Sequence, residues 1–290
     1  MGKIGVTGAT GQFGSTVIES LLARGVQPQD LRATTRDTGR ASALQAQGIE
    51  VRRGDFDDSQ ALRQAFEGVE RLLVISTDQV GARVEQHRRA VLAAKEAGVK
   101  QIAYTSIVDM GERDGQNVLA ADHRATERII LDSGIPYTLL RNTFYAELMV
   151  QPVIQALDRG VFVSSAGEAR LGAASRADLA EAAAVVLSQP GHAHRTYELT
   201  YPRPWDYREL AGVVSRVSGR AMEYRPVSGE EMEQILQQAG LPGQNIQMVL
   251  GMNASLRAGD ISKTGGDLEQ VLGRPVTSLE AIVRKLLPGA

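Results

Sequence analysis

Short hydrophobic runs alternate with longer amphipathic segments along the first half of the chain. The short runs are rich in β-branched residues, which predicts strands, and the segments between them repeat hydrophobic residues at helical spacing, which predicts helices. Strands are predicted at 3–7, 31–35, 49–53, 71–76, 100–106 and 136–142. Helices are predicted at 12–25, 39–47, 59–67, 81–97 and 118–133.

Glycine residues fall where these helices should stop, at Gly25, Gly48, Gly68, Gly98 and Gly134. Strands and helices that alternate on this scale form a parallel sheet covered by helices on both faces. Right-handed crossovers then leave little choice of topology. The pattern therefore predicts an α/β fold with a doubly wound parallel sheet.

The alternation changes after about residue 143. The pattern predicts a strand or hairpin and then an alanine-rich helix over 160–187, strands at 195–200 and 222–227, and helices at 206–219, 229–240 and 277–287. We therefore assign residues 1–143 to the domain that carries the sheet. Residues 144–290 are assigned mainly to a smaller α+β substrate-binding lobe, interleaved with the sheet.

The composition is that of an ordinary globular protein, with 43% hydrophobic and 23% charged residues and a net charge of −2. That charge gives no argument for nucleic acid or a membrane surface as a partner. The absence of cysteine excludes disulfides and thiolate metal sites and fits a reducing compartment. No signal-peptide pattern is seen, and no hydrophobic run approaches the roughly 18 residues of a membrane span. We expect a cytoplasmic protein without nucleic-acid or membrane partners.

The stretch VTGATGQFG places Gly8, Gly11 and Gly14 directly after the first predicted strand and at the start of the first predicted helix. Glycine permits a tight turn and lets backbone N–H groups approach a pyrophosphate, and the helix N-terminus adds free donors and partial positive charge. The alternative is a glycine turn that only joins strand to helix, but this context favours a dinucleotide loop. The predicted cofactor contacts here are Gly8, Thr10, Gly11, Gln12, Phe13 and Gly14.

The residues that follow the second predicted strand indicate which dinucleotide binds. A chain specific for NAD usually has an acidic residue about 20 positions after the glycines, where it holds the ribose 2′-OH. Here that position brings Arg36, with Arg40 nearby, and a guanidinium there pairs with a 2′-phosphate. The acidic Asp37 beside Arg36 is also compatible with binding of NADH. The alternative interpretation is that Arg36 is a surface residue without a role in cofactor binding. We predict NADPH as the cofactor, with NADH possible.

Polar residues also follow the next predicted strands. Asp55 and Phe56 come after the third, where a carboxylate and an aromatic ring suit the adenine. Ser76 and Thr77 come after the fourth, beside the ribose and nicotinamide path. Ligands of open sheets bind outside the carboxyl ends of the strands, which favours these positions over ordinary polar loops. Thr105, near the end of the fifth predicted strand, is assigned to the same site.

A family resemblance spans essentially the whole chain and rests on the segments VTGATGQFG, TTRD, GDFDD, LLVIS, KQIAYTS, TERIILDSGIPYTLLRN, SRADLAEAAAVVL and YELT. In these segments the chain resembles the NmrA-like branch of the atypical short-chain dehydrogenases/reductases. Within this branch it is most similar to the bacterial NAD(P)H:quinone oxidoreductases of type 2 and the triphenylmethane reductases. The resemblance implies a Rossmann-type sheet, NADPH, and reduction of quinones or cationic dyes. The branch also includes dinucleotide-binding regulators without established turnover.

The wider superfamily carries a Tyr–Lys acid–base pair on the helix predicted at 118–133. Aligned on SGIPYTLLRN, His123 takes the lysine position and Leu119 the tyrosine position, and no tyrosine of the chain has lysine four residues later. Reduction of an ordinary ketone builds an alkoxide that needs a proton donor. A quinone that accepts a hydride yields a delocalised anion that is less basic than an alkoxide. A triarylmethane cation that accepts a hydride becomes neutral and needs no proton. The missing pair therefore favours hydride transfer to an electron-poor planar acceptor, with the chemistry carried by the cofactor.

Three residues remain candidates for a role near the reacting atoms. His123 can donate to the nicotinamide ribose, and Glu127, one turn later on the same helical face, is placed to orient it. The alternative is that His123 is a partly exposed histidine on the helix. Asn142 follows the sixth predicted strand, where it can contact nicotinamide or substrate. Tyr145 suits a planar acceptor or only packs the lobe. The GHAH stretch at 191–194 is interpreted as a polar loop, so no metal site is predicted.

These observations predict an NADPH-dependent oxidoreductase that acts on a quinone or dye as a small-molecule acceptor. The alternative is a non-catalytic NADP(H)-binding sensor of the NmrA type. The two share the cofactor site and differ in whether turnover occurs. A monomer and a homodimer are both compatible with the sequence.

Overall fold

The computed structural model describes residues 2–79, 81–110 and 117–287. The chain forms two compact units, each made of segments that are separate in the sequence. The first unit consists of Met1–Asn142, Ala177–Leu199 and Gln270–Gly273. The second consists of Thr143–Arg176, Thr200–Glu269 and Arg274–Ala290.

The first unit is built on a parallel sheet of seven strands in the order β3-β2-β1-β4-β5-β6-β8. Every pairing in this sheet is parallel, so the predicted doubly wound α/β fold is confirmed. All carboxyl ends of the strands therefore lie along one edge of the sheet. The strands are β1 (Lys3–Val6), β2 (Leu31–Thr35), β3 (Glu50–Arg53), β4 (Val69–Val74), β5 (Gln101–Ile107), β6 (Tyr137–Asn142) and β8 (Arg195–Leu199).

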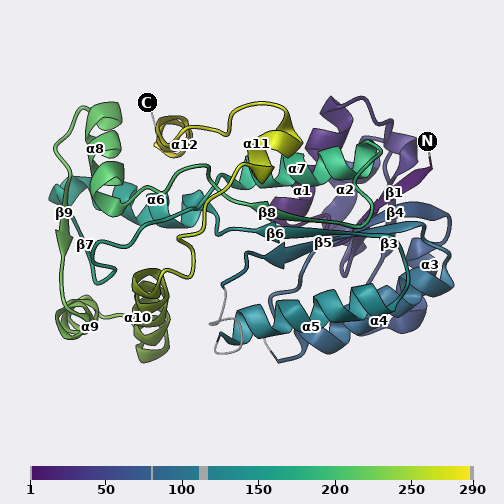
Figure 1. Ribbon diagram of the computed structural model, residues 1–290, viewed down its shortest axis with the longest axis horizontal. Helices are drawn as coiled ribbons and strands as arrows, with labels where there is room; N and C mark the ends of the chain where they lie inside the picture. Colours follow the sequence, from purple (N-terminus) through teal and green to yellow (C-terminus); the bar gives the residue numbers. More distant parts are fainter. Residues whose placement is uncertain (1, 80, 111–116, 288–290) are drawn as a thin grey trace. The chain divides into compact units, whose positions relative to one another are not determined.

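Helices cover both faces of this sheet, with α3, α4 and α5 on one face and α1 and α7 on the other (Figure 1). The five glycines predicted to end helices all have positive φ, between 73° and 87°, which residues with a Cβ rarely adopt. The helices of this unit are α1 (Gln12–Ala23), η1 (Pro28–Asp30), η2 (Thr38–Ala41), α2 (Ser42–Ala46), α3 (Ser59–Phe66), α4 (Arg83–Glu96), α5 (Val118–Asp132) and α7 (Arg176–Ser188).

One hydrophobic core cluster of the first unit lies between the sheet and the helices α3, α4 and α5. Leu72 and Ile102, on neighbouring strands, are fully buried there together with Phe66 and Ile130 of the covering helices. Because strands covered on both faces bury consecutive residues, all five residues of β2 are buried. This packing fixes the strand ends, which carry the polar residues of the site.

Helix α7 and strand β8 belong to the first unit. Sequence analysis placed both segments in the smaller lobe. Strand β8 pairs with β6 from Thr138 to Asn142, and the Arg71 guanidinium donates to the carbonyl of Leu187 at the end of α7 at 2.7 Å. Long-range pairing of this kind leaves no mark on local periodicity, which explains the difference.

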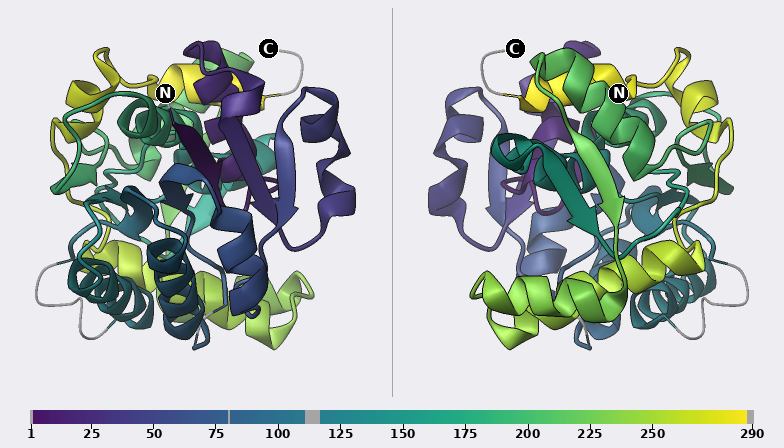
Figure 2. Two further views of the ribbon diagram at one scale, coloured as in Figure 1. Left: turned by 90° about the vertical axis from the view of Figure 1, so that its right-hand side faces the viewer. Right: turned by 90° about the vertical axis from the view of Figure 1, so that its left-hand side faces the viewer.

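The second unit contains a two-stranded parallel sheet, β7 (Val161–Ser164) with β9 (Glu223–Pro226), visible in the right-hand view of Figure 2. The rings of Phe162, Tyr207 and Tyr224 pack against one another there, with centroids 5.0 to 6.2 Å apart. The other elements are α6 (Ala146–Gln155), η4 (Leu157–Arg159), α8 (Tyr207–Ser218), α9 (Gly229–Gln238), α10 (Gly243–Ala258) and α12 (Leu279–Leu286), while α11 (Asp267–Leu272) contains the boundary between the units. No helix within the described ranges is long and hydrophobic enough to cross a membrane.

Candidate functional site

A cavity of about 580 Å³ lies at the carboxyl ends of β1, β2, β3 and β4 in the first unit. Its position is the one that the topology of an open parallel sheet favours for a dinucleotide. It is lined by Gly8, Thr10, Gly11, Gln12, Phe13, Gly14, Arg36, Asp55, Phe56, Ser76 and Thr77, all predicted as cofactor contacts, and also by Thr35, Asp37, Arg40, Gly54, Ile75, Asp78, Gln79 and Gln86.

The glycine loop forms the floor at the start of α1. Gly8 has a φ of +58°, and a Cβ on Gly14 would meet the carbonyl oxygen of Gly8 at 2.4 Å. Helix α1 begins after Gly11, without a side-chain cap or an acidic residue in its first turn. The helix N-terminus therefore faces the cavity with its dipole uncompensated, as a pyrophosphate requires.

The outer wall carries two basic residues, Arg36 and Arg40, both exposed at the surface of the cavity. The carboxylate of Asp37 accepts a hydrogen bond from the backbone N–H of Gly39 at 2.9 Å and caps the following 3-10 helix. One of its oxygens is thus committed to the protein backbone. This arrangement favours a phosphate at the outer wall over the 2′-OH of NADH.

Residues after β3 and β4 form the inner walls. Asp55 accepts from the backbone N–H of Asp57 at 3.1 Å. Phe56 is only 7% exposed and packs edge-on against the ring of His87 at 6.0 Å. Phe56 therefore belongs to the hydrophobic core as well as to the cavity, and only a small part of its ring is available to a ligand.

Helix α4 holds Thr77 by all three of its polar groups. The backbone N–H of Thr77 donates to His87 Nε2 at 3.0 Å, its carbonyl accepts from Arg83 Nε at 2.6 Å, and its hydroxyl donates to Gln86 Oε1 at 2.9 Å. These three helix residues are spaced i, i+3 and i+4 and so share one face, which is buried. Sequence analysis assigned none of them to the site, although polar residues at the core-facing positions of a helix were a usable signal.

Gln86 also joins two loops of the cavity. Its Nε2 donates to Asp57 Oδ2 at 3.2 Å and to Gln79 Oε1 at 3.0 Å. Asp57 is held a second time, by Arg89 at 2.9 Å. Helix α4 therefore fixes the β3–α3 loop relative to the β4–α4 loop.

The tautomer of His87 follows from its partners. Its Nε2 accepts from Thr77, and its Nδ1 lies 3.0 Å from the hydroxyl of Thr126, which itself donates to the carbonyl of Asp122 at 3.0 Å. The proton is therefore on Nδ1. Burial, followed by the nearby charge of Arg83, lowers the pKa of His87 to about 3. The ring is neutral at physiological pH.

His123 lies on α5 with 5% exposure, and its Nδ1 is 2.8 Å from the hydroxyl of Tyr104 on β5. The interpretation as a partly exposed histidine is therefore wrong. Burial, followed by Arg83, lowers the pKa of His123 to about 3, and burial raises the pKa of Tyr104 above its ordinary value. Tyr104 and His123 thus form a Tyr–His contact, although the sequence contains no Tyr–Lys pair at the spacing of four residues. Sequence analysis did not find this contact, because its two residues come from different elements.

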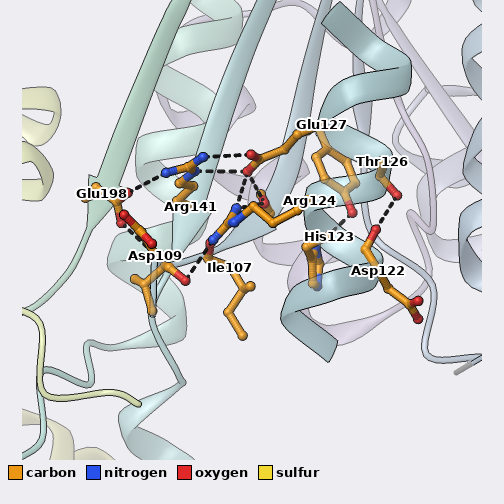
Figure 3. Close-up of polar contacts among 12 residues, drawn as sticks. Ile107, Asp109, Asp122, His123, Arg124, Thr126, Glu127, Arg141 and Glu198 are labelled. Atoms are coloured by element: carbon orange, nitrogen blue, oxygen red, sulfur yellow. Dashed lines mark hydrogen bonds and ion pairs between the residues drawn. The ribbon is translucent and has the colours of Figure 1, made fainter. Parts of the chain in front are cut away.

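Glu127 does not orient His123, which corrects the sequence-based expectation. Its carboxylate accepts from Ser106 at 2.5 Å, from Arg124 at 2.5 Å, and from both sides of the Arg141 guanidinium at 2.7 and 3.0 Å (Figure 3). Arg141 also pairs with Glu198 of β8 at 3.0 Å. This network holds the end of β5, because Arg124 donates to the carbonyls of Ile107 and Val108.

The remaining predicted residues do not line the cavity. Thr105 bridges two strands, since its hydroxyl accepts from the backbone N–H of Ser76 at 2.8 Å. Asn142, at the end of β6, is 6% exposed, and its Oδ1 has no hydrogen-bond partner among the described residues. Tyr145 lies in the second unit at the start of α6, where the Arg176 guanidinium is 4.7 Å from its ring centre. In the GHAH stretch, His192 Nδ1 lies 2.8 Å from the Tyr197 hydroxyl.

Comparison with known proteins identifies the family. The model of the NmrA-like family matches residues 1–282. The chain belongs to the NmrA-like family. The family membership and the Rossmann-type fold predicted from the sequence are therefore confirmed.

A curated relative and two solved structures match the chain over nearly its full length. Quinone oxidoreductase 2 of Escherichia coli (strain K12) is 40% identical over 284 residues, which cover 98% of each chain. The crystal structure of the Citrobacter sp. triphenylmethane reductase complexed with NADP(H) is 38% identical with a TM-score of 0.91 and covers 98% of this chain and 99% of that chain. The Escherichia coli NADPH-dependent quinone oxidoreductase complexed with NADPH is 40% identical with a TM-score of 0.89, at the same coverage.

Proposed function

We propose that this NmrA-like protein is an NADPH-dependent oxidoreductase that transfers a hydride to a quinone or a similar electron-poor planar acceptor, without a Tyr–Lys acid pair. The predictions of an oxidoreductase and of an NADP(H) cofactor are confirmed by the relatives described above. The observation that carries the proposal is the cavity that joins the glycine loop to Arg36 at the carboxyl ends of the strands.

The residues present fit NADPH. The glycine loop and the uncapped start of α1 suit the pyrophosphate, and Arg36 with Arg40 suits the 2′-phosphate. The buried Oδ1 of Asn142 lacks a partner within the described part of the chain, and the amide of a nicotinamide would supply a donor for it. The assignment of these residues to the cofactor is part of the proposal.

When bound, NADPH supplies a hydride from its dihydronicotinamide ring. The protein contributes alignment, through the loops that α4 fixes and through the strand ends that the Glu127 network holds. Among the described residues, Tyr104 is not an acid comparable to the superfamily tyrosine, because its buried hydroxyl faces His123 and its pKa is raised. Such a site suits a quinone, whose reduced anion is weakly basic and can take its proton from water.

The acceptor itself is proposed to bind mainly through residues 144–290, and Tyr145 is the aromatic candidate for contact with a planar ring. Arg176 already lies over that ring, and burial raises the pKa of the Tyr145 hydroxyl. The hydroxyl therefore stays protonated at neutral pH, and the ring rather than a phenolate is available for stacking.

A steady-state assay of NADPH oxidation tests the proposal and separates it from a non-catalytic NADP(H) sensor. We expect turnover with 1,4-naphthoquinone well above the reaction without protein. NADPH binding at micromolar concentration without oxidation by any quinone of a small panel would contradict the enzyme and support the sensor.

A matched pair of glycine variants controls for the site. Gly14→Ala should abolish NADPH binding and turnover together, because the new Cβ would lie 2.4 Å from the Gly8 carbonyl oxygen. Gly229→Ala should leave both unchanged, because no atom lies within 4 Å of a Cβ built there.

A further inference from the structure

Arg83 is a buried cation that has no carboxylate partner among the residues that the structure describes. It is 5% exposed, its Nε donates to the carbonyl of Thr77 at 2.6 Å, and its Nη1 has no hydrogen-bond partner among the described residues. No ion pair with Arg83 occurs in the described part of the chain, whereas the buried Arg32 and the half-buried Arg124 each pair with a glutamate. A buried guanidinium is costly unless its charge is compensated, so an uncompensated one suggests a role in binding.

The guanidinium lies against the loop that lines the cofactor cavity after β4, because its Nε donates to the carbonyl of Thr77. Arg83 opens α4, and the loop that precedes it, from Ile75 to Gln79, lines the cavity after β4. His87, on the same buried face of α4, accepts from the backbone N–H of Thr77, and its ring lies 5.3 Å from that of Tyr104 on β5, whose hydroxyl contacts His123 of α5. In agreement with this geometry, the charge of Arg83 contributes to the lowered pKa values of both histidines.

The lining of the cavity indicates the direction in which a dinucleotide would lie, with its reactive end toward this charge. Arg36, Asp55 and Phe56 line the cavity at the β2 and β3 side, which suits the adenosine half. The strand order continues from β1 through β4 to β5. A dinucleotide extended along the strand ends would therefore have its nicotinamide beside β4 and β5, near the Thr77 loop that Arg83 contacts.

Charge at this point acts differently on different acceptors. A neutral quinone that accepts a hydride, taken from reduced nicotinamide with both electrons, becomes the hydroquinone monoanion and then gains a proton from water. A fixed positive charge stabilises that developing anion. A triarylmethane cation carries positive charge before it reacts and loses it in the product, so the same fixed charge opposes its binding.

We infer that Arg83 is a specificity-determining residue whose buried guanidinium favours neutral and anionic acceptors over cationic dyes. This inference rests on the proposed hydride transfer and deepens it. Arg83 acts through its charge, so a lysine at this position should preserve the preference and an amide should remove it.

The test compares acceptors that differ in charge. Values of kcat/KM are measured for 1,4-naphthoquinone, 1,4-naphthoquinone-2-sulfonate and malachite green with the wild type, Arg83→Gln and Arg83→Lys. The glutamine can still donate to the Thr77 carbonyl, which protects the loop. Arg88→Gln is the control, since it removes a charge from an exposed position of the same helix.

For Arg83→Gln we expect the ratio of the kcat/KM for 1,4-naphthoquinone to the kcat/KM for malachite green to fall about tenfold or more. The kcat/KM for the sulfonated quinone should decrease most. Arg83→Lys should preserve most of the wild-type preference for the quinone, and Arg88→Gln should leave the ratio unchanged. The NADPH dissociation constant, measured by fluorescence titration, separates cofactor binding from acceptor preference because a weaker cofactor affects all acceptors equally.

Equal losses for all three acceptors in Arg83→Gln would overturn the inference and leave Arg83 as a support of the Thr77 loop. A wild type without turnover on any acceptor would instead contradict the proposed function. The two failures are therefore distinguishable.

Discussion

The residues predicted as cofactor contacts differ in how many of their polar atoms the protein already uses. Thr77 lines the cavity, but all three of its polar groups are bound by α4. Asn142, in contrast, keeps a buried oxygen without a partner in the described ranges. Sequence position predicted both as cofactor contacts, yet only the hydrogen-bond network shows which atoms remain for a ligand.

Arg36 should set the preference for NADPH. Its guanidinium is exposed on the outer wall of the cavity, and neighbouring Asp37 is occupied as a helix cap. We expect Arg36→Ala to raise the KM for NADPH about tenfold or more while the KM for NADH changes little. Steady-state kinetics with both cofactors measure this ratio.

Arg63→Ala is the control for Arg36→Ala, because Arg63 is an exposed arginine of α3 that does not line the cavity. An unchanged NADPH-to-NADH ratio in Arg36→Ala would show that Arg36 is a surface residue only.

At the scale of elements, α4 combines a structural and a functional face. Ala90, Val91 and Ala94 pack into the core, while Arg83, Gln86 and His87 point buried polar groups at the cavity loops. Periodicity predicted the helix and its extent closely, at 81–97 against the observed Arg83–Glu96. It could not show that the first two turns hold the cofactor loops, because this depends on which strand end lies opposite.

The joining of two loops by Gln86 should govern cofactor affinity. Gln86→Glu replaces the amide donor that reaches Asp57 with a second carboxylate at 3.2 Å. We expect the NADPH dissociation constant to rise about tenfold, with kcat at saturating NADPH nearly unchanged. Fluorescence titration and steady-state kinetics together measure this.

Asp57→Asn in the Gln86→Glu background should restore affinity, because an amide then faces the new carboxylate. Gln64→Glu adds the same charge at an exposed position of α3 and should have no effect. If Gln86→Glu binds NADPH as tightly as the wild type, the loops are fixed by other contacts.

At the scale of the whole molecule, two neutral histidines are buried where α4, α5 and β5 meet. The pKa values of His87 and His123 are both lowered from 6.5 to about 3 in the folded state, mainly by burial. Between these pH values the unfolded chain binds protons that the folded chain does not. The contribution to stability is complete above pH 6.5 and is lost as the pH falls toward 3.

Acid should therefore destabilise the protein through these two rings. We expect each histidine to lower the free energy of unfolding by about 2 kcal/mol between pH 6.5 and pH 5. Urea denaturation at a series of pH values should show a smaller loss in His87→Gln, in which the amide oxygen can still accept from Thr77. The control His194→Gln changes an exposed histidine and should keep the wild-type slope. Identical slopes in all three proteins would contradict buried neutral histidines.

The sequence by itself determined the elements that local periodicity and glycine position define. It predicted the six strands and five helices of the first half, the glycine loop, and Arg36 at the end of β2, because side-chain spacing and backbone freedom are local properties. The absence of a Tyr–Lys pair spaced four residues apart could also be established from the sequence, since that spacing is local.

Only the tertiary structure decided what distant segments do together. It paired β8 with β6, set Tyr104 of β5 against His123 of α5, and directed Glu127 to Arg141. It also left Arg83 buried without a carboxylate among the described residues. Each of these depends on contacts between residues far apart in the chain, where burial removes water and fixes which charges and hydrogen bonds are compensated.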